Sequence, residues 1–166
     1  IAVIAADGDG TITKVEFFRG TTKIGTATAS PFGFAWTNVS GGTYSLTAKA
    51  TDDRGAVGTS AAVTVKVNKP PTALVTAPAN TAKFAAPVNV TLQASATDAD
   101  GTVGKVEFLR NGTLLATDTA SPYSYAWNNV PIGTHTVTAR ATDNAGAATT
   151  STAVTFTVAA NQPPAV

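Results

Sequence analysis

The sequence predicts an all-β protein built from two tandem antiparallel β-sandwich modules, and three observations support this fold class. Charged residues make up only 13% of the chain, and Thr, Ala, Ser and Gly take their place. These residue types suit strands and turns better than helices. No stretch carries apolar residues at helical spacing, and a long segment of the chain is repeated. We therefore expect strands and turns with essentially no helix.

The repeat relates residues 1–67 to residues 92–158 without a gap, so that Asp7 corresponds to Asp98. Roughly half of the aligned positions are identical, which is the mark of a duplicated structural unit. The segment "KVEFFRG" returns as "KVEFLRN", "ASPFGFAW" returns as "ASPYSYAW", and "TAKATDDRGA" returns as "TARATDNAGA". The two copies are therefore expected to fold as two modules of one kind.

The two copies are cut at different points of the module. The second copy has a leader, residues 69–90, ahead of the part that matches the first, whereas the first copy has none. We expect the first module over residues 1–68, without its first strand (strand A), and the second over residues 69–160. Residues 161–166, "NQPPAV", repeat "NKPPTA" and are expected to begin the leader of a further module.

Seven strands are expected in the second module, because short alternating segments are separated by turn residues. Asn111-Gly112 is typical of a type I′ hairpin turn. Trp36 and Trp127 are expected at the centres of the two cores. Strands A to G are predicted near residues 72–76, 88–97, 103–110, 113–119, 123–127, 134–142 and 149–158. Side chains expected to point inward include Leu92, Phe108, Tyr125, Trp127, Val137, Ala139 and Val154.

These motifs, above all "DADGTVGKVEFLRNG", "SPYSYAW" and "TARATDNAGA", resemble the bacterial immunoglobulin-like (Ig-like) domain repeats. The resemblance covers the second module entirely and the first from its second strand onward. The leader "APANTAKF" departs from the pattern, because it lacks the usual Gly in that turn. The resemblance implies two tandem Ig-like sandwiches. It also implies a place in secreted polysaccharide-degrading enzymes or surface adhesins, which commonly carry such repeats.

Composition and motifs argue against several classes of function. Net charge is +1 with scattered basic residues, so no basic stripe for nucleic acid is present. No apolar run approaches the ~18 residues that span a bilayer, and the chain has no Cys. The one His, His135, has Tyr44 as its counterpart, and we expect its side chain on the outer face of its strand. We assign no catalytic and no cofactor-binding residue, and the chain is expected not to be an enzyme.

The acidic turns are the sharpest functional signal and have two interpretations. The "DADG" turn and the "TDNAG" turn are expected at one end of the sandwich, near the entering leader. The favoured interpretation is a plain turn, in which Asp binds its own backbone and Gly supplies a positive φ. The alternative is a Ca²⁺ site, because Ca²⁺ takes six to eight oxygen ligands from such loops. The candidate ligands are Asp98, Asp100 and Asp143, with Asp7, Asp9 and Asp52 as weaker equivalents in the first module.

The favoured function is a non-catalytic spacer in a secreted or cell-surface bacterial protein. One alternative is an adhesion module that binds polysaccharide or another surface ligand. A second alternative is a strand-complemented filament subunit, because a module without strand A exposes an unpaired sheet edge. Expected partners are neighbouring Ig-like modules of the same or another chain, with polysaccharide under the first alternative. Nucleic acid and membrane insertion are not expected. No cofactor is required, and Ca²⁺ enters only under the metal interpretation.

Overall fold

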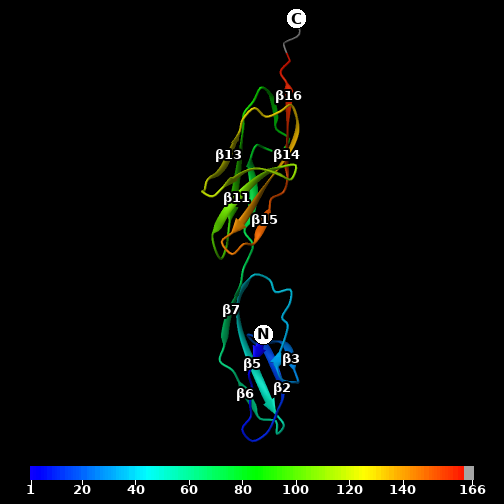
Figure 1. Ribbon diagram of the computed structural model, residues 1–166, viewed down its shortest axis with the longest axis vertical. Helices are drawn as coiled ribbons and strands as arrows, with labels where there is room; N and C mark the ends of the chain where they lie inside the picture. The colour runs from blue at the N-terminus through cyan, green and yellow to red at the C-terminus, as the bar shows by residue number, and fades with distance from the viewer. Residues whose placement is uncertain (163–166) are drawn as a thin grey trace. The chain divides into compact units, whose positions relative to one another are not determined.

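The computed structural model describes residues 1–162, which contain sixteen β-strands and no helix (Figure 1). The chain divides into two compact units, Ile1–Asn68 and a second that begins at Lys69. The all-β prediction is therefore confirmed. None of the described segments forms a helix of the length and apolarity that crossing a membrane requires. The last four residues of the predicted further leader, 163–166, lie outside the described part.

The second unit is a sandwich of two sheets. One sheet has three strands in the order β13-β10-β8, and the other runs β12-β11-β14-β16-β9, with β15 paired to β14. Every pair in this unit is antiparallel except β9 with β16. The strands are β8 (Thr72–Ala77), β9 (Lys83–Ala86), β10 (Val90–Thr97), β11 (Val103–Arg110), β12 (Thr113–Asp118), β13 (Tyr123–Trp127), β14 (Gly133–Asp143), β15 (Ala148–Thr150) and β16 (Val154–Ala160).

Two features of the second unit differ from the predicted strands. Predicted strand G is broken into β15 and β16, because Ser151 Oγ accepts a hydrogen bond from Ala139 N (3.0 Å) and donates one to Thr152 O (2.8 Å). The leader also contributes β9, which the sequence did not predict. It pairs in parallel with β16, with Lys83 opposite Thr157. The sandwich is therefore not wholly antiparallel.

The predicted hairpin between β11 and β12 is confirmed. Asn111 and Gly112 both have positive φ, 49° and 81°, as a type I′ turn requires. Asn111 also ties the turn to the neighbouring strand, because its N–H donates to Thr136 O (2.9 Å) and its Oδ1 accepts from Thr136 N (3.3 Å).

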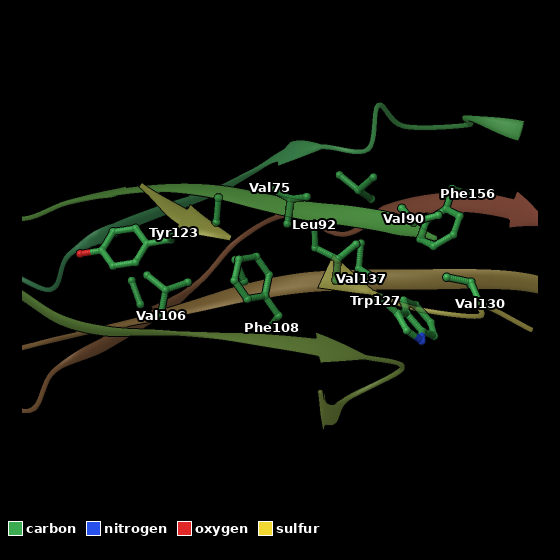
Figure 2. Close-up of a cluster of buried hydrophobic side chains, with 14 of the residues drawn as sticks. Val75, Val90, Leu92, Val106, Phe108, Tyr123, Trp127, Val130, Val137 and Phe156 are labelled. Atoms are coloured by element: carbon green, nitrogen blue, oxygen red, sulfur yellow. The ribbon is translucent and has the colours of Figure 1, made fainter. Parts of the chain in front are cut away.

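Alternation along the strands buries one continuous core in the second unit (Figure 2). Leu92, Phe108 and Val137 are at most 1% exposed, and Trp127 is 7% exposed. Tyr125, also expected inward, is only partly buried against this cluster. Trp127 packs edge-on against two other rings at centroid distances of 5.1 and 6.1 Å. The predicted central position of Trp127 is therefore confirmed.

The first unit has the same central strands and a smaller core. Its main sheet runs β3-β2-β5-β6, with β7 also paired to β5, and β1 pairs with β4 alone. Trp36 lies beyond the end of β4, is only half-buried and packs edge-on against Tyr44 at 5.1 Å. The central position expected for Trp36 is therefore wrong. The strands are β1 (Ala2–Val3), β2 (Ile12–Arg19), β3 (Thr22–Ala27), β4 (Phe32–Gly33), β5 (Gly42–Asp52), β6 (Val57–Thr59) and β7 (Val63–Val67).

Candidate functional site

The two acidic turns of the second module meet at one end of the sandwich, as the strand order predicted. One turn joins β10 to β11, and the other joins β14 to β15. Asn144 links them, because its N–H donates to Thr102 O (2.9 Å) and its Oδ1 accepts from Thr102 N (3.1 Å). The sequence analysis did not single out Asn144. The sequence feature that could have identified it is its place directly after Asp143 in the "TDNAG" turn, where an Asn side chain can bind backbone N–H groups.

Each predicted ligand of the second module accepts a backbone N–H in this structure, Asp98 and Asp143 within their own turns and Asp100 from the linker. Asp143 is 5% exposed, and its Oδ1 accepts from the backbone N–H of Ala145 and Ala147, both at 2.9 Å. Asp98 Oδ1 accepts from Asp100 N at 3.3 Å. The carboxylate of Asp100 receives the backbone N–H of Lys69, at 3.3 Å from each oxygen. Asp residues that bind backbone N–H groups in this way stabilise tight turns.

The glycine of the "DADG" turn has a different role from the one predicted. Gly101 is not among the glycines with positive φ, so backbone conformation does not select it. A Cβ at this position would lie 2.6 Å from Asp98 Oδ2 and closer still to Asn144 Oδ1. Gly101 is therefore needed for space, because the two side-chain oxygens converge above its Cα. Asp98 Oδ2 is buried there and has no hydrogen-bond partner among residues 1–162.

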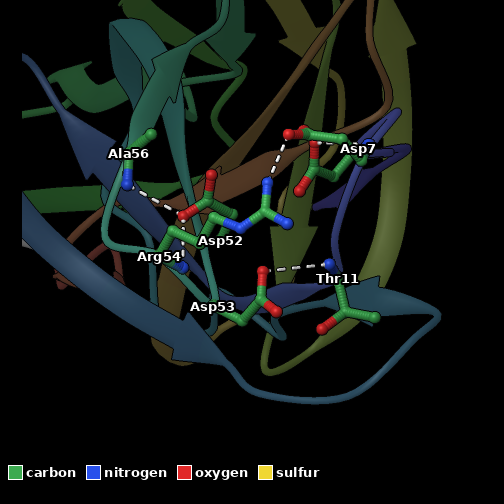
Figure 3. A network of polar contacts seen from close by, with 7 residues as sticks. Asp7, Thr11, Asp52, Asp53, Arg54 and Ala56 are labelled. Carbon is green, nitrogen blue, oxygen red and sulfur yellow. Dashed lines mark hydrogen bonds and ion pairs between the residues drawn. The ribbon is translucent and has the colours of Figure 1, made fainter.

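The first module repeats this arrangement with one ion pair added (Figure 3). Asp52 Oδ1 accepts from Arg54 N (2.9 Å) and Ala56 N (2.8 Å), as its counterpart Asp143 does in the second module. Asp53 takes the place of Asn144, and its Oδ1 accepts from Thr11 N at 3.3 Å. The guanidinium of Arg54 binds the carboxylate of Asp9, and the second module has Ala at the position of Arg54.

The carboxylates at the predicted metal site are close in the fold but do not form a common ligand shell here. Within residues 1–162, no group of three or more His, Cys, Asp or Glu side chains is arranged to hold a metal ion. In the second module, Asp98 and Asp100 lie in one turn and Asp143 caps the other. In the first, Asp7 Oδ1 is 3.5 Å from Asp9 N, and Asp9 is paired with Arg54. Calcium binding at these residues stays a prediction.

His135 is buried, so its expected position on the outer face is wrong. The side chain is 1% exposed and lies between the rings of Trp127 (5.1 Å) and Phe156 (5.2 Å). His135 shares its strand face with Val137, so period-two alternation places it inward. Its Nε2 is 2.8 Å from Pro131 O and its Nδ1 has no partner among the described atoms. The ring is therefore enclosed by the core.

The first module makes the same link with a different side chain. Tyr44, the counterpart of His135, donates its hydroxyl to Ser40 O at 2.6 Å. In both modules the side chain at the start of the long strand reaches the carbonyl four residues earlier. In both modules an aromatic ring with a polar atom at this position forms a hydrogen bond that holds the preceding loop in place.

Comparison with known proteins agrees with this architecture. A model of the family described as bacterial Ig domain matches residues 1–48 and 71–139. The chain belongs to the bacterial Ig domain family. Each of its two modules contributes one of the matched segments.

Several solved structures are similar to the chain. The fibronectin(III)-like modules of Clostridium thermocellum CbhA have 30% sequence identity, with 95% of this chain and 83% of that chain covered and a TM-score of 0.47. The three N-terminal domains of the highly immunogenic outer capsid protein (Hoc) of bacteriophage RB49 have 13% identity. Coverage there is 94% of this chain and 52% of that chain, with a TM-score of 0.44. No curated protein matches the chain.

Proposed function

We propose that the chain is a non-catalytic spacer in a secreted or cell-surface bacterial protein. The observation that carries this proposal is that side chains able to act as acids, bases or metal ligands instead stabilise the fold of the modules. His135 is enclosed in a core, and Asp52 and Asp143 cap equivalent turns in the two modules. Membership of the bacterial Ig domain family supports the same function.

The connection between the modules supports a spacer that resists bending. Strand β7 ends at Val67 and β8 begins at Thr72, so residues 68–71, "NKPP", make the whole connection. Consecutive prolines hold φ near −65° and favour an extended backbone, so a short Pro-Pro linker is semi-rigid. The backbone N–H of Lys69 is bound by Asp100, and Pro71 is buried. The linker is therefore fixed to the second module.

Pulsed electron paramagnetic resonance tests the stiffness of this linker. The chain has no Cys, so the exposed residues Thr22 and Thr113 can be changed to Cys and spin-labelled. We expect one narrow distance distribution, which broadens when Pro70 and Pro71 are both changed to Gly. The matched control changes residues 61–62, "AA", to Gly in an exposed loop of the first module, and it should leave the distribution narrow. A parent distribution as broad as that of the linker variant would contradict a stiff spacer.

Binding to polysaccharide is the competing function from the sequence analysis. A spacer is expected to remain in the supernatant when mixed with insoluble polysaccharides and centrifuged. Saturable retention on one polysaccharide, abolished by the soluble form of the same sugar, would contradict the spacer proposal and favour the adhesion module.

We also propose that the acidic turn of the second module takes up Ca²⁺, and one observation favours this. Asp98 Oδ2 is buried and has no hydrogen-bond partner within the described part of the chain, and Asn144 Oδ1 lies beside the same Gly101 position. Asn144 Oδ1 accepts one hydrogen bond, from Thr102 N, and keeps a second lone pair. The two side-chain oxygens, with Asp100 and solvent, suit a hard cation. Calorimetric melting with chelator and then with millimolar Ca²⁺ should show a stabilisation, by mass action, that Asp98→Asn removes and Asp118→Asn keeps. Identical melting curves would refute calcium binding.

A further inference from the structure

The hairpin of β11 and β12 in the second module encloses a small hollow that contains one cationic side chain. The hollow has a volume of about 340 Å³ and is lined by Arg110, Asn111, Thr113 and Leu115. All four residues belong to the hairpin, with Arg110 at the end of β11 and Thr113 at the start of β12. The hollow therefore belongs to the second module alone.

Arg110 lies on the inner face of its strand, where a charged side chain is unusual. Val106 and Phe108 precede it at a period of two and are at most 1% exposed, so the three side chains share one face. The guanidinium carbon of Arg110 lies 5.4 Å from the centroid of the Trp127 ring. This cation–π contact stabilises the charge in part, and it holds the plane of the guanidinium in place.

The guanidinium of Arg110 has no anionic partner within the described residues. Its Nε is buried and has no hydrogen-bond partner among residues 1–162. None of the ion pairs in that range includes Arg110. A buried charged donor without a partner is costly, so the ring contact with Trp127 leaves part of that cost uncompensated. An anion bound in the hollow would compensate it.

The other polar groups of the hollow are also suited to an anion. Asn111 Oδ1 accepts from Thr136 N at 3.3 Å, so the NH₂ group is the end of this amide that remains to donate. The hydroxyl of Thr113 is a further donor, and no carboxylate lines the hollow. A guanidinium binds a carboxylate through two parallel N–H···O bonds. The donor set is therefore complementary to a carboxylate.

The strand beside the hollow favours a peptide as the carrier of that carboxylate. Among residues 1–162, β12 pairs only with β11, so its other edge has unpaired backbone groups. Such an edge is a template for an extended peptide, whose alternate side chains point to the same face. No aromatic ring lines the hollow for a sugar to stack on, and Trp127 is only 7% exposed. A peptide therefore fits these features better than a polysaccharide.

The first module has the cation but not the full donor set. Arg19, the counterpart of Arg110, lies 5.7 Å from the Tyr44 ring, and its side chain is exposed. Gly20 stands in place of Asn111, so the amide donor is absent there. The complete arrangement of stacked guanidinium, amide and hydroxyl occurs in the second module.

We propose that the hollow at Arg110 is a binding site for an acidic side chain of an extended peptide from a partner protein. The Asp or Glu carboxylate of the peptide accepts two hydrogen bonds from the guanidinium. Asn111 and Thr113 donate to its remaining lone pairs, and the peptide backbone pairs with the open edge of β12. The site goes beyond the spacer function, which does not require it.

A fluorescein-labelled hexapeptide of alternating Thr and Asp tests the site on the full chain. We expect saturable binding in fluorescence anisotropy that weakens as salt rises, together with a shift of the Arg110 Nε–H signal in NMR spectra. Arg110→Gln should weaken binding at least about tenfold, because it removes the charged donor. Arg140→Gln is the matched control, since it removes the same charge from a side chain that is 52% exposed and paired with Glu107. The same peptide with Asn in place of Asp should not bind.

Four outcomes would overturn the proposal. They are the absence of saturable binding, equal weakening by Arg110→Gln and Arg140→Gln, equal binding of the Asp and Asn peptides, and tighter binding of trigalacturonate at the same Nε–H signal. The last outcome would assign the site to an acidic sugar. A melting curve of Arg110→Gln without peptide checks its fold. The two peptides are compared on the parent chain, so that comparison decides the question even if the variant unfolds.

Discussion

Trp127 is the side chain whose truncation most directly tests the packing of the second module. It is 7% exposed and contacts His135 and Phe156 edge-on. A buried Trp removes up to about 250 Å² from water, which at about 25 cal/mol/Å² is ~6 kcal/mol. A compact denatured state lowers this value by roughly 10–40%. We therefore expect Trp127→Ala to cost about 4 kcal/mol, within the usual range for core aromatics.

Calorimetry of the full chain measures this cost. A loss of ~4 kcal/mol in a domain of this size lowers the melting temperature by at least about 15 °C. Trp36→Ala is the matched control in the first module, where the side chain is half-buried beyond the end of its strand, and roughly half that loss or less is expected. A Trp127→Ala chain that melts within about two degrees of the parent would refute the core assignment.

Three further predictions follow from particular polar groups and one glycine. By urea unfolding, Tyr44→Phe should lower the free energy of unfolding by about 1 kcal/mol, because it removes the hydrogen bond to Ser40 O. His135→Phe should lower it less, because it also removes the buried Nδ1 that has no partner among the described atoms. A larger loss for His135→Phe would contradict this. Backbone N–H groups of Ser124 and Ala120 lower the pKa of Asp118 below 3.8, so the stabilisation that Asp118→Asn removes at pH 7 should vanish as pH falls through that depressed pKa. If the difference in free energy of unfolding between the parent and Asp118→Asn did not change with pH, this would be evidence against the hydrogen bonds from Ser124 and Ala120. Gly101→Ala should cost about 1–3 kcal/mol by crowding, whereas Gly8→Ala, with no atom within 4 Å of the added Cβ, should be nearly neutral.

Strands A to F of the second module could be predicted to within about two residues because alternation and turn residues agree there. Predicted strand G is broken into β15 and β16. Strand β11 (Val103–Arg110) buries Val106 and Phe108 on either side of the less buried Glu107 and ends at the Asn-Gly turn, and its bounds were predicted as found. Strand β9 could not be predicted in this way. Its four residues form a strand only because β16, far along the chain, offers a parallel edge. Tertiary pairing decides such short segments.

The candidate site could also be predicted only in part, because some of its contacts depend on the tertiary fold. The strand order alone brings the two acidic turns to one end of each module. Sequence could not show that Asn144 and Asp53 bridge those turns, because bridging depends on where the opposite backbone N–H lies. The burial of His135 was predictable from the face it shares with Val137. Alternation along the strand was assigned to the wrong face for His135. The buried polar ring needs a hydrogen-bond partner and finds one in the carbonyl of Pro131.

Single-molecule force spectroscopy tests the central claim most directly, since a spacer must carry load as separately folded modules. Pulling the chain from its two ends should give two unfolding events. Their contour-length gains should be about 20 nm for the first module and about 30 nm for the second, from ~3.6 Å per residue. The first module should yield at lower force, because the buried core within residues 1–68 is smaller. A single event, or extension without a resolved unfolding force, would contradict the account.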